Sequence, residues 1–175
     1  MILSGKEIIK QVEEGKIYIE NFKPEKVNPN SYNLTINPKM KVYKIDPIKG
    51  YVDSKAEPEL EEVIIPEDGY VLEPGKFYLA ATNEYTKTDG YIPMIDGRSS
   101  FARLGVQVHM TAGFGDVGFE GTFTLEIATM QPVKIYPNQE ICQIYYQTIA
   151  GDPSIVYTGK YARSRETVGC RLYTE

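Results

Sequence analysis

The chain has 175 residues, enough for one substantial hydrophobic core and too few for two, so residues 1–175 are expected to form a single domain. Its composition, 42% hydrophobic and 25% charged, is ordinary for a globular domain. The formal net charge of −5 argues against general nucleic-acid binding, which relies on broad basic surfaces, but not against a small anionic ligand in a local basic pocket.

The sequence also argues against a membrane or secreted protein. No apolar run is long enough to span a bilayer, and the N-terminus is charged from its sixth residue, unlike a signal peptide. The only cysteines, Cys142 and Cys170, are widely spaced, which predicts free thiols in a reducing cytoplasm.

The first predicted element is a short amphipathic helix over residues 4–15. Ser4 and Glu7 have the spacing of a capping box, and Ile8 and Val12 recur at helical spacing.

Most of the remaining chain favours short strands separated by turns. Strands are expected within 32–36, 41–45, 62–82 (three segments), 105–112, 121–129, 132–137 and 140–150. One or two helical turns are expected over 99–104, a surface excursion over 46–61, and a C-terminal tail or lid over 160–175. This spacing of strands and turns is typical of an all-β sandwich or barrel.

Two arginines and two adjacent serines gather in DGRSSFARLG, residues 96–105. Ser99 and Ser100 could cap the short helix that follows, and Arg103 falls one helical turn beyond Ser99 on the same face. Arg98 adds a second fork-shaped donor. The pattern favours a phosphate site and a capped turn with two solvated arginines about equally.

The second notable stretch is HMTAGFGDVGFEG, residues 109–121, a glycine-rich loop between strands. Such a loop is costly in backbone entropy unless it needs special dihedral angles or a close ligand approach. Asp116 could accept a sugar hydroxyl or simply form a turn. His109 is the only histidine, and by itself it fits a hydrogen-bonded strand residue better than a catalyst.

The third stretch is TFTLEIAT, residues 122–129, in which apolar and polar residues alternate. Leu125 and Ile127 share one face of the predicted strand, and Glu126 lies on the other. An exposed sheet face would account for this carboxylate. If that face lines a cavity instead, Glu126 could serve as a proton shuttle.

Absent patterns exclude several enzyme classes. A zinc nucleobase deaminase requires a His or Cys ligand together with a P-C-x-x-C pair, which one histidine and two distant cysteines cannot supply. There is no G-x-S-x-G elbow of a serine hydrolase, and no Walker or Rossmann glycine loop.

Taken together and in order, these stretches resemble the dCTP deaminase family, part of the dUTPase-like superfamily. The matching segments are MILSGKEI, NPNSYNL, IDGRSSFARLG, HMTAGFGDVGFEGTFTLE, ICQIYY and VYTGKY. The resemblance implies a mainly β, dUTPase-like distorted β-barrel or jelly roll (β-clip) with a short N-terminal helix. It also implies a homotrimer with its sites between neighbouring subunits.

The resemblance further implies roles for individual residues. Glu126 resembles the general base and acid that activates water, with Ser99 positioning that water and Arg103 completing the catalytic set. The implied substrate-binding residues are Arg98, Ser100, His109, Ala112, Asp116, Tyr157, Lys160, Arg163 and Ser164. Among these, Ala112 would meet the pyrimidine edge through its backbone, Asp116 would take the 3′-hydroxyl, Tyr157 would pack on the sugar, and Lys160 would reach the phosphates.

The activity implied by the resemblance is zinc-independent deamination of dCTP to dUTP and ammonia, with Mg²⁺ bound through the substrate triphosphate and no protein metal ligands. The alternatives are a dUTP pyrophosphatase or a bifunctional deaminase–dUTPase that forms dUMP, and a catalytically silent nucleotide-binding regulator. Phe114 stands where the monofunctional bacterial type carries Arg, which leans toward the bifunctional branch. Ser164 stands where the family commonly has a phosphate-contacting glutamine, and Arg163 or Arg165 could replace that glutamine electrostatically.

Overall fold

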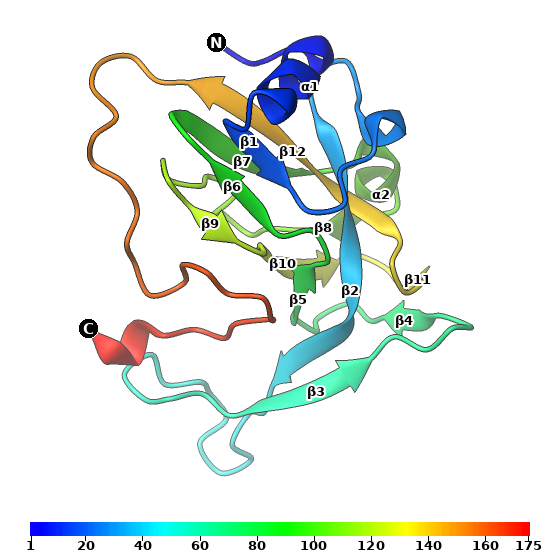
Figure 1. Ribbon diagram of the computed structural model, residues 1–175. Helices are drawn as coiled ribbons and strands as arrows, with labels where there is room; N and C mark the ends of the chain where they lie inside the picture. The colour runs from blue at the N-terminus through cyan, green and yellow to red at the C-terminus, as the bar shows by residue number, and fades with distance from the viewer.

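The computed structural model describes residues 1–175 and is mainly β (Figure 1). Its elements in chain order are α1 (Gly5–Glu13), β1 (Ile17–Ile19), η1 (Pro24–Lys26), β2 (Tyr32–Tyr43), β3 (Leu60–Ile64), β4 (Tyr70–Leu72), β5 (Tyr78–Thr82), β6 (Thr86–Thr88), β7 (Tyr91–Gly97), α2 (Ser99–Arg103), β8 (Val106–Gln107), β9 (Glu120–Gly121), β10 (Thr124–Thr129), β11 (Val133–Ile135), β12 (Glu140–Thr148) and η2 (Leu172–Thr174).

The strands form three sheets around one apolar core. The largest sheet has the order β7-β12-β2-β5-β10-β8, with β3 also paired to β2, and the smaller sheets are β1-β6-β9 and β11-β4. Every pairing is antiparallel. The predicted mainly β, barrel-like fold with a short N-terminal helix is therefore confirmed.

The long strand β2 joins the two halves of the largest sheet. Its first half pairs with β12 and its second half with β3 and β5, and its register against β5 shifts between Ile36 and Met40. A register shift of this kind bends a strand, which helps a sheet to curve around its core. Leu34, Ile36 and Met40 are fully buried in that core.

Helix α1 begins as predicted, because Ser4 is its N-cap and accepts a hydrogen bond from the Glu7 backbone N–H at 3.3 Å. The second half of the predicted capping box, in which the Glu7 side chain would accept the Ser4 backbone N–H, is wrong. The Glu7 carboxylate accepts a bond from the Gln11 amide at 2.8 Å instead of reaching back to Ser4.

The strand predicted over 105–112 is wrong beyond Gln107, where β8 ends. The Val108 carbonyl still accepts the Glu126 N–H at 2.9 Å, but the next hydrogen bond runs from the Met110 N–H to the Glu126 Oε2 at 2.9 Å instead of to a backbone carbonyl, so the regular ladder does not continue. The chain then leaves the sheet edge and becomes the loop that begins at His109. The excursion predicted over 46–61 falls on the irregular connection between β2 and β3, except that its last two residues, Leu60 and Glu61, are the first two of β3 (Figure 1).

Candidate active site

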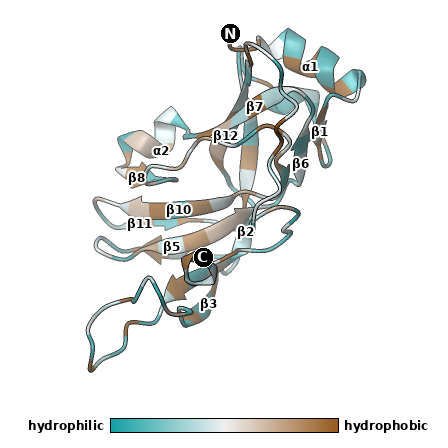
Figure 2. Ribbon diagram, turned by 90° about the vertical axis from the view of Figure 1, so that its left-hand side faces the viewer, coloured by the Kyte–Doolittle hydropathy of each residue, from teal (hydrophilic) through white to brown (hydrophobic).

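The alternation of β10 aims Glu126 away from the core. Its neighbours Leu125 and Ile127 are buried, and Glu126 is half-buried on the opposite face. The strand is held on both sides, by β5, where Glu126 pairs with Leu79, and by β8 (Figure 2). One carboxylate oxygen, Oε2, accepts the Met110 N–H, and the other makes no hydrogen bond within the chain.

Glu126 lines a cavity of about 890 Å³. Five of the residues that the sequence assigned to the substrate share this cavity with it: Ala112, Asp116, Tyr157, Lys160 and Ser164. They come from the loop before β9 and from the C-terminal tail, whereas Glu126 itself lies on strand β10. Cavities of this size hold small organic ligands in proteins.

The loop that carries Ala112 and Asp116 lies tightly against β7. The Gly113 carbonyl accepts the Ile95 N–H at 2.7 Å, and the Gly115 N–H donates to the Pro93 carbonyl at 2.8 Å. The loop passes so close that a Cβ on Gly113 would lie 2.6 Å from the Ile95 carbonyl oxygen. Glycine is therefore required at position 113, because the backbone of β7 leaves no room for a side chain. The glycine-rich sequence of the loop predicts a close approach of this kind.

Aromatic rings form one wall of the cavity. Phe119 packs on Phe123 with ring centroids 4.6 Å apart and on Tyr157 at 5.8 Å. The Tyr157 N–H donates to the Val117 carbonyl at 2.8 Å, which fixes this tyrosine beside the loop. At another part of the lining, Tyr43 is half-buried, and this burial raises its pKa.

The C-terminal tail brings a cation and a hydroxyl to the cavity. Lys160 is paired with the Glu175 carboxylate, and that hydrogen-bonded pairing raises the pKa of the Lys160 ammonium. Ser164 lies nearby, with its hydroxyl donating to the Glu166 carbonyl at 2.9 Å. Thus the tail closes over the cavity formed by its own chain.

The residues of the DGRSSFARLG stretch lie outside this cavity, on and before α2 beside β8 (Figure 2). The prediction that the serines cap α2 is wrong. The N-cap position is Arg98, with no side-chain cap, so Ser99 and Ser100 begin the helix itself. Their exposed hydroxyls make no hydrogen bond within the chain. Arg103 reaches back to the Ser99 carbonyl at 3.3 Å, as the helical spacing predicts.

Arg98 of this stretch and two other predicted substrate residues, His109 and Arg163, make contacts elsewhere and also lie outside the cavity lining. Arg98 is bound to β12, where its guanidinium donates to the Glu140 carbonyl at 2.9 Å and pairs with the Glu140 carboxylate at 3.2 Å. Arg163 is 80% exposed and lies 3.7 Å from the Glu120 carboxylate. His109 has its Nε2 3.6 Å from an Asp96 oxygen, and its buried Nδ1 has no partner.

The structure adds lining residues that sequence reasoning missed. Thr124 could have been predicted from the alternation of the strand, because it lies two positions before Glu126 and therefore on the same face. Phe119 lies within the glycine-rich stretch 109–121 but was not singled out there. No local pattern pointed to the others, which come from distant segments: Tyr43, Phe77, Leu79 and the tail residues Val168 to Cys170.

Three further observations describe the chain as a whole. No group of three or more His, Cys, Asp or Glu side chains gathers as metal ligands. Both cysteines are free, Cys142 buried and Cys170 exposed. Neither the length nor the hydropathy of any helix is sufficient for crossing a membrane.

A sequence model of the dCTP deaminase-like family matches residues 2–149. The chain therefore belongs to the dCTP deaminase-like family, as the sequence resemblance predicted.

Individual relatives agree with this assignment. The chain is 56% identical over its full length to "dCTP deaminase, dUMP-forming" of Clostridium botulinum (strain Alaska E43 / Type E3), of which it covers 98%. It is 52% identical to the protein of the same name from Clostridium beijerinckii, again with 100% and 98% coverage.

A solved structure shows the same fold. The crystal structure of 2′-deoxycytidine 5′-triphosphate deaminase from Agrobacterium tumefaciens matches with a TM-score of 0.64 at 21% identity, covering 84% of this chain and 47% of that one.

Replacing Gly113 with alanine tests the close packing of the loop. The added Cβ would also lie 3.0 Å from His109 Nε2, so the loop or β7 must shift. We expect Gly113→Ala to lower the thermal unfolding midpoint by several degrees, which corresponds to an overpacking cost of about 1–3 kcal/mol.

The matched control is Gly97→Ala, whose Cβ would meet only ordinary contact with Val108 at 3.8 Å. Its unfolding midpoint is expected to stay within about 2 °C of the parent value. If Gly113→Ala and the parent protein have the same unfolding midpoint, the loop is not held against β7 as described.

Proposed function

We propose that this protein is a hydrolase that converts dCTP to dUMP, releasing ammonia and pyrophosphate. The dUMP-forming names of the relatives, at 56% and 52% identity over the whole chain, support this activity. They favour the bifunctional alternative over the dUTP-forming reaction that was the main expectation from sequence. Phe114, exposed at the cavity lining, is in keeping with that branch.

The single observation that carries the proposal is the position of Glu126 in the cavity. A carboxylate on a rigid, doubly paired strand faces a space that also holds a lysine and several aromatic rings. This combination suits a nucleotide, which presents an anionic end, an amphipathic sugar and a flat base.

In the proposed deamination, Glu126 moves a proton in two stages. Its Oε2 is held by the Met110 N–H, which leaves Oε1 free to take a proton from water. The water oxygen bonds to C4 of the cytosine while the C4–N3 double bond opens and its electron pair moves to N3, which gives a tetrahedral intermediate. Glu126 then returns the proton to the amino nitrogen, the C4–N3 double bond re-forms as the bond to that nitrogen breaks, and ammonia leaves. The remaining 4-hydroxyl transfers its proton to N3 and gives uracil. A second water hydrolyses the α–β phosphate link of the resulting dUTP.

The base and sugar are assigned to the loop and the aromatic wall. Ala112 would meet the pyrimidine edge through its backbone. The Asp116 carboxylate is exposed and makes no hydrogen bond within the chain, so it is available to the 3′-hydroxyl. Tyr157, braced by Phe119, would pack against the deoxyribose and disfavour a 2′-hydroxyl.

The triphosphate is assigned to the tail. Lys160 is paired with Glu175, and we propose that the phosphates displace this carboxylate. Mg²⁺ would enter as part of the substrate, because phosphate oxygens are ligands that this hard cation prefers. The proton transfers assigned to Glu126 require no zinc. Arg98, engaged by Glu140, would act by holding the turn before α2.

We further propose that the protein is a homotrimer in which a neighbouring copy supplies Ser99, Ser100 and Arg103. These residues lie outside the cavity of their own chain. The exposed Ser99 and Ser100 hydroxyls are free for another molecule, and the exposed Arg103 guanidinium makes only a local bond to the Ser99 carbonyl. Beside them, Leu104 is 46% exposed and Met130 is 78% exposed, an apolar surface suited to subunit contact. In such an arrangement Ser99 would position the water and Arg103 would bind phosphate.

The reaction products test the activity directly. Incubation with dCTP and Mg²⁺ is expected to release ammonia, pyrophosphate and dUMP in equal amounts, resolved by chromatography and an ammonia assay. Glu126→Gln is expected to lower ammonia release by a factor of about 10²–10⁴, with the dCTP dissociation constant changed only a few-fold. Accumulating dUTP would identify a monofunctional deaminase, and an absence of ammonia would refute deamination.

The control for that variant is Glu62→Gln, an exposed carboxylate on strand β3 remote from the cavity lining. It is expected to keep the parent rate of ammonia release. Undiminished activity in Glu126→Gln would remove this residue from the chemistry.

Mixed oligomers test whether sites are shared between copies. Arg103→Ala and Glu126→Gln should each be nearly inactive when purified alone. Co-expressed in equal amounts, they should regain activity at roughly a quarter of the sites, because an intact site takes its carboxylate from one variant and its arginine from the other. No recovery in purified mixed oligomers would place all catalytic groups on one chain.

A further inference from the structure

The C-terminal tail contains a single buried residue. After Tyr146 in β12, every residue except Thr167 is exposed or half-buried, and Thr167 is 5% exposed. An apolar anchor would be the usual way to secure a chain end, whereas here the buried group is a hydroxyl. A buried hydroxyl needs hydrogen-bond partners, so its surroundings reveal what holds it.

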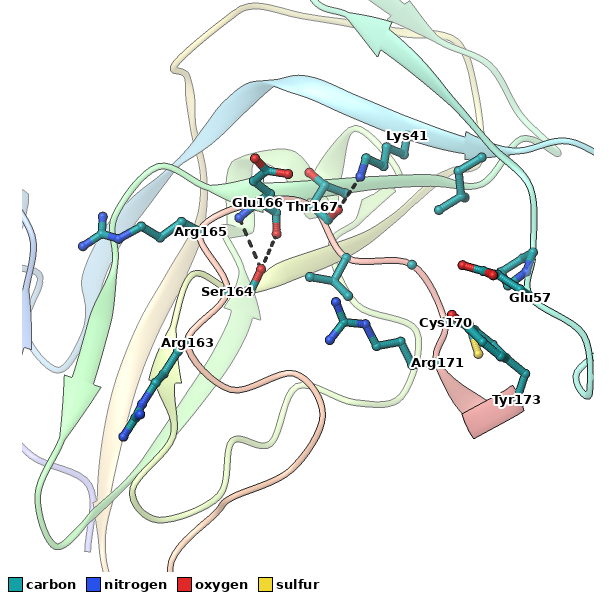
Figure 3. A pocket seen from close by; sticks show the side chains of 14 residues that line it. Lys41, Glu57, Arg163, Ser164, Arg165, Glu166, Thr167, Cys170, Arg171 and Tyr173 are labelled. Atoms are coloured by element: carbon teal, nitrogen blue, oxygen red, sulfur yellow. Dashed lines mark hydrogen bonds between the residues drawn. The ribbon is translucent and has the colours of Figure 1, made fainter. Parts of the chain in front are cut away.

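Thr167 makes hydrogen bonds to two neighbouring strands. Its Oγ1 accepts the Ala81 N–H of β5 at 2.9 Å and donates to the Lys39 carbonyl of β2 at 3.2 Å. Its own carbonyl accepts the Lys41 ammonium at 2.8 Å (Figure 3).

The irregular pairing of β2 and β5 explains why these two backbone groups are available. Their register shifts between Ile36 and Met40, so Lys39 and Ala81 lie where the regular ladder is interrupted. A buried N–H left without an acceptor is costly. The Thr167 hydroxyl serves both strands at once, as acceptor for one and donor to the other.

Hydrogen bonds on either side of Thr167 continue this attachment. The Val168 N–H donates to Thr124 Oγ1 at 3.1 Å, on the same face of β10 as Glu126. The Cys170 N–H donates to the Tyr43 hydroxyl at 3.2 Å, and the Ser164 carbonyl accepts the Thr122 N–H at 2.9 Å.

The attached segment forms a wall between two hollows. Ser164 and the run from Val168 to Cys170 line both the 890 Å³ cavity and a second hollow of about 560 Å³ on the other side. In the second hollow, Arg163 and Arg165 extend away from Lys41 (Figure 3). The wall therefore separates the Glu126 cavity from a polar, open surface.

We propose that Thr167 is a positioning residue that fixes this wall and so sets the distance of Lys160 and Ser164 from the substrate. Its effect on turnover rests on the proposed function, whereas its effect on the wall does not. Without the hydroxyl, the Ala81 N–H loses its acceptor and the Lys39 carbonyl loses its donor. The tail segment around Thr167 then detaches from β2 and β5. The phosphate subsite then loosens while Glu126, held by β5 and β8, keeps its place.

The test compares Thr167→Val, which keeps the shape and removes the hydroxyl, with Thr167→Ser, which retains it. In nucleotide-free protein, hydrogen exchange of the Val168 and Cys170 amides should speed up about tenfold in the valine variant and return to near the parent rate in the serine variant. With dCTP, the valine variant should show a KM raised about tenfold and a kcat within about twofold of the parent.

Thr158→Val is the matched control, since Thr158 is an exposed tail threonine that makes no hydrogen bond. It should match the parent protein in both measurements. Unchanged amide exchange in Thr167→Val would overturn the proposal. Faster exchange with an unchanged KM, or an equal loss of kcat and kcat/KM, would overturn the positioning role. A parent protein that leaves dCTP unchanged would refute the proposed function alone, because the exchange comparison still decides whether Thr167 holds the wall.

Discussion

The site depends on the two-sided pairing of strand β10. Leu125 and Ile127 are buried in the core. Because successive side chains of a strand point to opposite faces, Glu126 lies on the face opposite the core. The same carboxylate then shapes its own surroundings. By accepting the Met110 N–H it takes the place of a backbone acceptor at the start of the loop that carries Ala112 and Asp116. A single side chain thus links the sheet, the loop and the proposed chemistry.

Around that rigid point, the remaining parts of the site are attached more loosely. The loop is held by close backbone contact with β7, and the tail by hydrogen bonds centred on Thr167. This division suits the proposed reaction. Proton transfer needs a carboxylate placed within hydrogen-bonding distance, whereas a triphosphate must enter past Lys160 and its products must leave. Lys160 already pairs with the Glu175 carboxylate, and this is the contact that the proposed triphosphate would replace.

Much of this arrangement was predictable from local patterns. Alternation located the face of Glu126, turn residues separated most of the strands, and helical spacing placed Arg103 near Ser99. The errors arose where side chains replaced backbone partners. Beyond Gln107 the regular pairing predicted over 105–112 is replaced by irregular contacts, among them the bond from the Met110 N–H to the Glu126 carboxylate. The serines of α2 do not cap the helix because Arg98 occupies the N-cap position. The anchoring of the tail was beyond sequence reasoning, because it depends on a register shift between β2 and β5, which no local window contains.

The most direct test of the account is a crystal structure of Glu126→Gln bound to dCTP and Mg²⁺. The account predicts the cytosine C4 beside position 126, the deoxyribose against Tyr157, and the triphosphate between Lys160 and Arg103 of the partner subunit. A nucleotide bound outside the 890 Å³ cavity, or a base directed away from β10, would contradict it.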